Sequence, residues 1–417
     1  MENVSILKIA SPSQTRLGKG VIVLIDSLLF LATLLIGADK FAFEVFGVAV
    51  RIDQFILLLL ALIMLASGCF KLVYRREMVF FLASAFLSVL FSFNKIRGAA
   101  FFLSIVYNYI FVFCLYKNYI DNFGIGKFIK IFRATLYVDI FILLIQVGLK
   151  MVFNKEIPFM PSYGEFRGVH RFALWFYEPS YLATYLSFFF AFALFELLFK
   201  EKKSYIIDLL LCLLGFLLST STSGFISIAL VFLFAYIAYL FKGKRSSVKF
   251  GLPMLVIIGL VIFRFAFSNV YDVFVNRIFS EGLNSASGGR MEQYGETLSV
   301  FLSNPIFGVG PGNYGAYLGI GNDYVPSNVT LELMATLGIL GMVSYYLISL
   351  GYILRIKKVF ITDKKTYMSL LFALIIFTIV LQFNQGYLRL YHWMYFGILE
   401  GVLSYSNKKK SAVIAFL

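Results

Sequence analysis

The loop that ends in Glu178-Pro179-Ser180 carries the first side chains able to do chemistry. If the second half of this loop is helical, Arg167, Arg171 and Glu178 lie on one face, because they recur at helical spacing. Arginine suits a diphosphate, since its planar fork donates hydrogen bonds in pairs and stays charged at any relevant pH. A carboxylate beside two guanidinium groups could act as a general base.

The structural alternative for this loop involves the same residues. Arg171 would stack on Trp175 at a membrane interface, and Glu178 would simply cap the helix that begins at Pro179. His170 could be a base, although a single histidine in a Phe-rich loop is more often structural. For Arg171 and Glu178, a role in chemistry is favoured over stacking and capping.

A second group of polar residues lies later in the chain, around Arg290 and Tyr294. The stretch 287–303 is amphipathic, and it is predicted to be helical up to the Asn-Pro pair at 304–305, because proline disfavours helix in the residue before it. Arg290 is the arginine of this stretch that could face an anion.

Gly308 and Gly310 follow, and they fit either a turn at a membrane surface or a close approach of backbone to a phosphate. A spanning helix is then predicted to open at Ser327 and Asn328, with Glu332 one turn further on the same face. The structural alternative is an N-cap by Ser327 and close helix packing by the glycines.

The turn 384–393 is predicted to join the last two helices on the external side, and it holds Arg389 and His392. We expect it to line the same site as the two loops. Its tyrosines and tryptophan also fit an aromatic belt at a membrane interface.

The elements that must position these residues are membrane helices. The 417 residues are 60% hydrophobic and 14% charged, which no soluble fold of ordinary composition matches. The sequence therefore predicts an all-α polytopic membrane protein in a single domain, 1–417. Apolar runs near the spanning length of ~20 residues predict about twelve transmembrane helices, at 20–37, 52–70, 79–94, 98–116, 129–151, 179–199, 204–220, 223–241, 250–268, 327–353, 366–384 and 390–406.

Lysine and arginine clusters separate these runs in alternation, and the positive-inside rule places them and both termini in the cytoplasm. The net charge of +15 is thus expected to reflect topology and not a nucleic-acid partner. Two long loops, 154–177 and 269–325, fall on the opposite, periplasmic side. The cytoplasmic loops are too short for a nucleotide-binding domain and no P-loop motif occurs, so any chemistry must use energy already held in the substrate, such as a lipid-linked diphosphate.

The order of the later motifs resembles a known family. The pieces are Gly289-Arg290, then Asn304-Pro305-Ile-Phe-Gly308-Val-Gly310, then Asn328 followed after nine residues by Gly338-x-x-Gly341. Over roughly 209–346 this pattern is similar to the O-antigen ligase and Wzy polymerase superfamily. The arginine-rich stretch ending at 178–180 also resembles many Wzy-type polymerases.

The resemblance implies a GT-C-like glycosyltransferase of the bacterial inner membrane that acts on glycans linked to undecaprenyl diphosphate, with Arg290 holding the diphosphate and no cofactor. Metal independence is expected because arginines can supply the charge and no ligand cluster occurs. The ligases carry a histidine where this chain has Ser327, and a second ligase arginine is absent from 219–224, so Arg167 or Arg171 would have to replace it. These departures favour a polymerase.

The sequence thus predicts an enzyme that polymerises lipid-linked repeat units into O-antigen or a related surface polysaccharide. Its expected partners are the lipid-linked donor and acceptor, membrane lipid and a chain-length regulator of the Wzz type. A ligase that transfers glycan to lipid A core remains an alternative in the same class. A lipid-linked oligosaccharide flippase is the alternative that is not an enzyme.

Overall fold

The fold is known from a computed structural model. It describes residues 17–45, 48–158, 160–166, 169–242, 290–321, 324–359, 374–376, 378–384 and 386–414, together with the single residues 254, 264, 268 and 271. The predicted span 250–268, the first half of the second long loop and Arg167 therefore lie outside the described residues, apart from these single positions.

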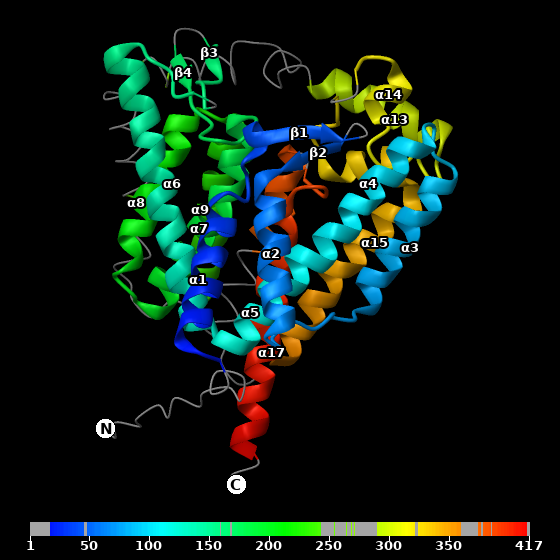
Figure 1. The fold of residues 1–417 in the computed structure, drawn as a ribbon. Helices are drawn as coiled ribbons and strands as arrows, with labels where there is room; N and C mark the ends of the chain where they lie inside the picture. Colours follow the sequence, from blue (N-terminus) through cyan, green and yellow to red (C-terminus); the bar gives the residue numbers. More distant parts are fainter. Residues whose placement is uncertain are drawn as a thin grey trace, which may run out of the picture.

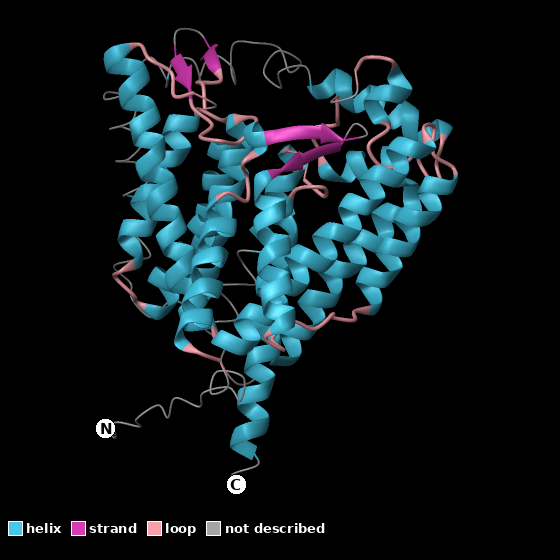
Figure 2. Cartoon of the chain, in the orientation of Figure 1, coloured by secondary structure: helices cyan, strands magenta, loops and turns pink. Residues whose placement is uncertain are grey.

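Helices make up most of the described chain, and short strands form two hairpins (Figure 2). The helices are α1 (Lys19–Leu34), α2 (Ile52–Ala66), α3 (Arg76–Leu90), α4 (Lys95–Tyr107), the π-helix η2 (Asn108–Phe113), α5 (Cys114–Phe123), α6 (Ile125–Phe153), α7 (Pro179–Lys200), α8 (Tyr205–Ser219), α9 (Thr222–Lys242), α13 (Arg290–Ser303), α14 (Tyr314–Leu318), α15 (Val329–Val359) and α17 (Leu390–Ile414), with 3-10 turns η1 (Asp39–Phe41) and η3 (Leu381–Phe383). The strands are β1 (Ala42–Val45), β2 (Val48–Arg51), β3 (Gly164–Phe166) and β4 (Val169–Arg171).

The long helices run side by side and form a bundle (Figure 1). Within it α7 packs on α8 and α9, α15 packs on α3, and α17 packs on α5. Helix α1 starts and α17 ends at one end of the bundle, while both hairpins, α13 and α14 lie at the other end (Figure 1). We call the second end the hairpin end. The segments predicted to be external thus share one end, opposite the two chain termini.

The two hairpins are an addition to the predicted all-helical fold. Strands β1 and β2 pair antiparallel between α1 and α2, and β3 pairs antiparallel with β4 inside the first long loop. The segment 41–51 is rich in Phe and Val, which are residue types enriched in strands.

Within the part of the chain that the structure describes, four helical stretches are long and apolar enough to cross a membrane: Lys95–Phe123, Ile125–Phe153, Pro179–Lys200 and Val329–Ile356. Shorter apolar helices accompany them, among them Ile52–Ala66 and Tyr205–Ser219. The first stretch corrects a predicted boundary, since α4, η2 and α5 continue one another and extend the predicted span 98–116 in both directions.

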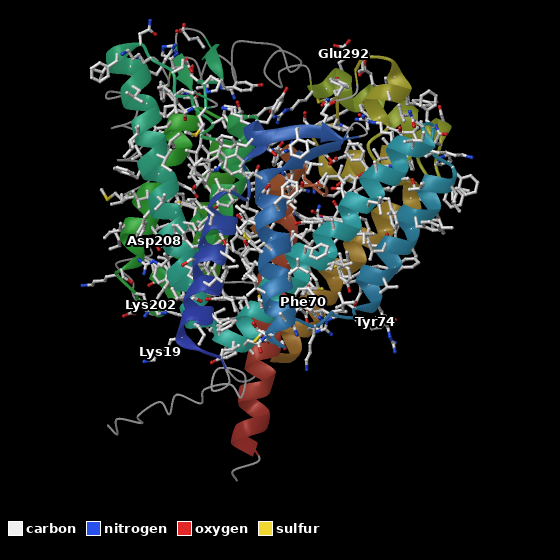
Figure 3. All side chains as sticks on the ribbon, viewed as in Figure 1. Lys19, Phe70, Tyr74, Lys202, Asp208 and Glu292 are labelled. Carbon is white, nitrogen blue, oxygen red and sulfur yellow. The ribbon has the colours of Figure 1, made fainter. Side chains whose placement is uncertain are left out.

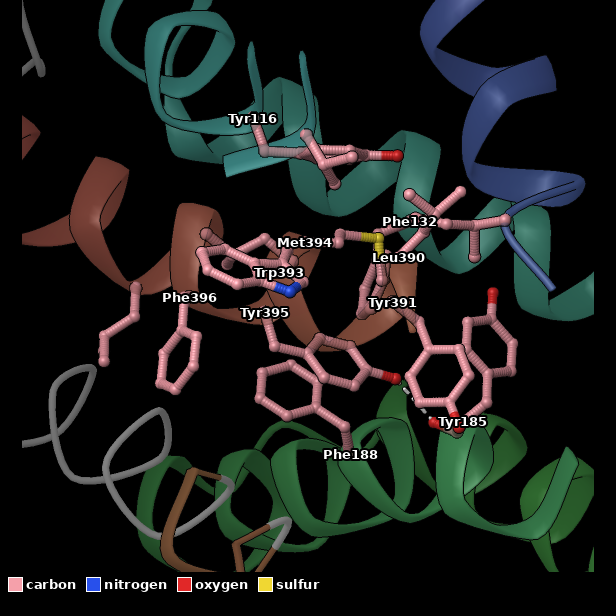
Figure 4. Close-up of a cluster of buried hydrophobic side chains, with 14 of the residues drawn as sticks. Tyr116, Phe132, Tyr185, Phe188, Leu390, Tyr391, Trp393, Met394, Tyr395 and Phe396 are labelled. Atoms are coloured by element: carbon pink, nitrogen blue, oxygen red, sulfur yellow. Dashed lines mark hydrogen bonds between the residues drawn. The ribbon is translucent and has the colours of Figure 1, made fainter. Parts of the chain in front are cut away.

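Aromatic side chains fill the core between α17 and its neighbours α5 and α7 (Figure 4). The rings of Phe188 and Tyr395 stack with centroids 4.0 Å apart, and the Tyr395 hydroxyl donates to the Tyr185 carbonyl at 2.7 Å. All three cysteines are free and buried, as expected for small core residues. The many Phe and Tyr residues therefore serve helix packing as well as the lipid-facing surface.

Candidate functional site

Arg171 is presented by a β-hairpin and not by a helix. It ends β4 and pairs in register with Gly164 of β3. Its guanidinium lies over the ring of Tyr163, with the central carbon 5.2 Å from the ring centroid. The helical face predicted for the second half of this loop is therefore wrong, and so is the alternative that Arg171 stacks on Trp175.

Arg171 and Arg290 nevertheless come together from two different loops. Burial lowers the pKa of Arg171, Tyr163 and Glu178 raise it, and the charge of Arg290 lowers it again. Those influences require the side chains of Tyr163, Glu178 and Arg290 to lie within electrostatic range of Arg171. Within the described residues the Nε of Arg171 is buried without a hydrogen-bond partner. The charges of Glu178 and Arg290 thus both act on Arg171 at the hairpin end of the bundle.

Glu178 occupies the N-cap position of α7, with Pro179 in the first turn as predicted. Its side chain makes no capping hydrogen bond to the helix backbone. Instead, Oε2 accepts a hydrogen bond from the Ser180 hydroxyl at 3.0 Å. The carboxylate is half-buried, and its charge acts on Arg171, so capping alone does not account for it.

Two side chains fix the irregular segment between β4 and α7. Gln146 of α6 donates to the Met160 carbonyl at 2.7 Å and accepts from the Leu174 amide at 3.2 Å. Lys40 donates to the carbonyls of Pro161 and Leu174 at 3.0 and 3.1 Å. Leu174 has a φ of +56°, a strained conformation for a side chain of this size. These hydrogen bonds hold the backbone in place on either side of Arg171.

Arg290 is the first residue of α13, and the helix ends at Ser303 as the following Asn-Pro pair predicts. Gln293, one turn along, donates to the Val325 carbonyl and accepts from the Ser327 amide, each at 3.0 Å. The Gln293 side chain thus links the start of α13 to the start of α15, and it fixes the position of Arg290 relative to α15.

Asn328, and not Ser327, caps α15. The Asn328 side chain accepts from the Leu331 amide at 3.0 Å and donates to the Gln382 carbonyl at 2.8 Å. The predicted Ser327 cap is therefore wrong. The predicted substrate-binding role of Asn328 gains no support, since both groups of its amide are used in holding the helix start.

The glycine cluster serves helix packing. The amides of Gly308 and Gly310 donate to Asn304 and Thr336 carbonyls at 3.0 and 2.9 Å, so neither is free for a phosphate. A Cβ on Gly308 would stand 2.4 Å from the carbonyl carbon of Thr336, and one on Gly338 would stand 2.2 Å from the oxygen of Ile306. Gly308 and Gly310 seat the loop in the kink of α15 at Gly338, which fits the structural alternative, and their predicted binding role gains no support.

The structure also contains an ion network, centred on Asp39, that the sequence analysis did not find. Oδ1 of Asp39 accepts from Arg51 at 2.6 Å and from Arg389 at 2.8 Å. Burial alone would raise the pKa of Asp39, but Arg389 and Arg51 hold it below its ordinary value. The Arg389 guanidinium also lies 3.9 Å over the Tyr181 ring, one turn into α7. The predicted site residue Arg389 is therefore held in place by a carboxylate near the chain start.

Glu332 belongs to the same region. It is 2% exposed, its Oε2 accepts from the Gly386 amide at 3.2 Å, and the charge of Arg389 reaches it. His392 is also buried and hydrogen-bonds to the Tyr345 hydroxyl inside the bundle. His392 therefore packs in the core and does not line the site.

The remaining predicted residues differ in their surroundings. Trp175 is 4% exposed, which leaves little ring surface for a sugar, so its predicted binding role gains no support. His170 pairs with Glu165 across the β3–β4 hairpin at 3.1 Å, which fits the structural alternative. Tyr294 is half-buried one turn into α13, on the same side of the helix as Arg290.

Two further groups of ion pairs tie helices together. Glu400 of α17 is fully buried and forms ion pairs with two arginines. One is Arg75, just before α3, and the other is Arg355 of α15, at 2.7 Å. Arg133 of α6 bonds Asp208 of α8 at 2.7 Å. Figure 3 places Asp208 well below the hairpin end. These pairs hold neighbouring helices together and bring no further charge to Arg171 and Arg290.

The fold and the site define a helical membrane protein. Its hairpin end holds guanidinium groups and a carboxylate, a set of charges that could bind an anion. The sequence profile described as O-antigen ligase (Wzy_C) matches residues 208–346. This match supports the O-antigen ligase and polymerase superfamily for that part of the chain, which is nearly the stretch that the motifs predict. No curated protein matches the sequence. The match supports a role in the biosynthesis of surface polysaccharide, in which members of this family transfer glycosyl groups.

Proposed function

We propose that the protein is a Wzy-type polymerase that transfers a growing glycan from undecaprenyl diphosphate onto the next lipid-linked repeat unit, on the periplasmic face of the inner membrane. The proposed frame is GT-C-like, with about twelve spanning helices and both termini in the cytoplasm. The action of the Arg290 and Glu178 charges on Arg171, which joins two separate loops, carries this proposal.

The charge balance of the group supports a diphosphate ligand. Two like charges held in range of each other repel, and burial of Arg171 adds to the cost of its charge. A bound diphosphate would relieve both penalties, because it places negative charge between the two guanidinium groups. Protein charges fixed in advance at a leaving group are an efficient form of catalysis, since no reorganisation is needed during the reaction.

In the proposed step, a sugar hydroxyl of the acceptor attacks the anomeric carbon of the donor glycan. The new carbon–oxygen bond forms as the bond from that carbon to the diphosphate oxygen breaks, and the diphosphate leaves with the electron pair. Glu178 takes the hydroxyl proton as general base. Arg171 and Arg290 hold the departing diphosphate, so that no metal ion is needed.

A polymerase is favoured over a ligase by the residue at position 327. The Ser327 amide is bound to Gln293, and a serine hydroxyl cannot act as a base near neutral pH. The ligases of the superfamily have histidine there. This chain would therefore take its base from Glu178, at the end of the first long loop.

Purified protein in vesicles, supplied with lipid-linked repeat units, tests the proposal. A ladder of products that differ by one repeat unit is expected. Transfer of finished polymer to added lipid A core, without a ladder, would instead identify a ligase. Movement of the lipid across the vesicle membrane with no new glycosidic bond would identify a transporter.

A further inference from the structure

Helix α13 (Arg290–Ser303) presents an apolar stripe to its surroundings in addition to the stripe that packs on the protein. Gln293, Thr297 and Val300 are buried and face α15 and α14, with the Thr297 hydroxyl 2.8 Å from that of Tyr314. Met291, Leu298 and Leu302 recur at i, i+7 and i+11 on a different face, and they are 51%, 44% and 66% exposed.

A third face of α13 is polar. Glu292 and Glu296 are exposed and are separated from Leu298 and Leu302 by part of a helical turn. Figure 3 shows Glu292 at the hairpin end, pointing away from the bundle. A helix with one apolar and one acidic exposed face suits a boundary between hydrocarbon and water.

The exposed stripe of α13 continues into apolar surface on neighbouring elements. Ile306, in the turn after α13, is 53% exposed, and the next ring, Phe307, stacks on Phe91 with centroids 4.1 Å apart. Phe93, whose amide donates to the Val309 carbonyl at 3.0 Å, and Ile96 are 61% and 73% exposed. Ile96 lies in the first turn of Lys95–Phe123, which is long and apolar enough to span a membrane. The stripe is therefore continuous with the outer end of a lipid-facing helix.

We propose that α13 is an interfacial helix whose Met291, Leu298 and Leu302 side chains rest in the hydrocarbon of the outer leaflet. Arg290 and Tyr294 lie on the edge of α13 between the buried stripe and the exposed apolar stripe. They therefore stand where a lipid headgroup meets the protein. This inference rests on the proposed function in one respect: it explains how Arg290 is held at the depth of a lipid-linked diphosphate.

Single spin labels in bilayer nanodiscs test the location of α13. The native cysteines are buried, so cysteines introduced as Leu298→Cys, Leu302→Cys, Glu292→Cys and Glu296→Cys can be labelled selectively. Labels at 298 and 302 are expected to collide with oxygen several-fold more than with a water-soluble nickel chelate, and those at 292 and 296 the reverse. Equal nickel access at all four positions would overturn the proposal.

A second variant separates this inference from the proposed reaction. Leu302→Glu places a charge in the stripe at a largely exposed position, so folding in detergent should be unaffected. In a bilayer it should raise the KM for lipid-linked substrate by about tenfold, because a leucine-sized contact with hydrocarbon is lost. Correct label depths without any polymerising activity would contradict the proposed function and leave the interfacial helix standing. An unchanged KM together with nickel access at 302 would contradict the interfacial helix alone.

Discussion

Arg171 at the end of β4 and Arg290 at the start of α13 lie within range of each other's charge, although they come from two separate loops. Burial lowers the pKa of Arg171, and the charge of Arg290 lowers it further. Bringing two cations together costs free energy unless a ligand or a neighbouring acid compensates. This pair is therefore the part of the molecule from which an anionic substrate can be inferred.

Arg290→Ala should abolish or nearly abolish glycan transfer while the protein still inserts and folds. Loss of one fixed donor to a developing negative charge typically costs about 10²–10³ in rate. The measurement is product-ladder formation in reconstituted vesicles, with the thermal unfolding midpoint as the check on folding. Lys155→Ala, which removes an exposed cation just beyond α6, is the matched control and should keep full activity. Equal losses in both variants would point to net charge and not to a specific contact.

The variants Arg171→Ala and Arg290→Ala should be non-additive. If both side chains hold one diphosphate, removing the second after the first should cost less than removing it alone, because groups that act as a unit do not contribute separately. Single-turnover rates of the two single variants and the double variant give the coupling. Two effects that simply multiply would mean that the arginines act at separate sites.

Asp39→Asn should destabilise the hairpin end and reduce activity, because it leaves Arg51 and Arg389 without their shared carboxylate. Breaking a buried ion pair typically costs ~3–5 kcal/mol. The thermal unfolding midpoint in detergent measures this effect, and Glu165→Gln, at an exposed acid on the β3–β4 hairpin, is the control.

The same residue predicts a pH dependence with a definite sign. The pKa of Asp39 is below its ordinary value in the folded protein. Its contribution to stability is therefore fully present above the pKa of the unfolded chain, about 4, and is lost as the pH falls towards the lower folded-state pKa. The unfolding midpoint of the native protein should drop more steeply below pH ~4 than that of Asp39→Asn. Parallel curves would contradict the assignment.

Gly338→Ala should lower the unfolding midpoint strongly. Gly338 has a φ of +67°, and a Cβ there would meet the Ile306 oxygen at 2.2 Å. Strain and overpacking of this kind cost ~1–3 kcal/mol each. Gly295→Ala is the contrasting variant, since nothing lies within 4 Å of its Cβ in α13 and alanine favours helix, so a small gain is expected. A tolerated Gly338→Ala would refute the packing role of the glycine cluster.

The sequence predicts the helical membrane fold and the partners Arg171, Glu178 and Arg290, but it gives the wrong local geometry for the first loop. Helical spacing suggests a shared face for Arg171 and Glu178. They meet instead because β4 ends at Arg171, and Gln146 and Lys40 fix the turn that leads back to α7. The prediction that these charges lie near one another does not depend on the predicted helix, because a hairpin can also direct side chains to one point.

The network around Asp39 and the role of the glycines could not be read from the sequence. Asp39 and Arg389 lie at opposite ends of the chain, and no local spacing connects them. Glycine clusters bind phosphate in some proteins and allow close packing in others. Only the position of Gly308 against Thr336 decides between the two here. The Asp39 and Arg51 pair, on either side of a segment rich in Phe and Val, was the signal available in advance.

Binding of undecaprenyl diphosphate to the purified protein tests the central claim most directly. Its dissociation constant should be compared for the native protein, Arg171→Ala, Arg290→Ala and Lys155→Ala in nanodiscs, with undecaprenyl monophosphate as the second ligand. The account predicts weaker diphosphate binding in each arginine variant, an unchanged constant for Lys155→Ala, and a smaller effect of both arginine variants on the monophosphate. Native-strength diphosphate binding in either arginine variant would contradict the proposal that Arg171 and Arg290 hold the leaving group.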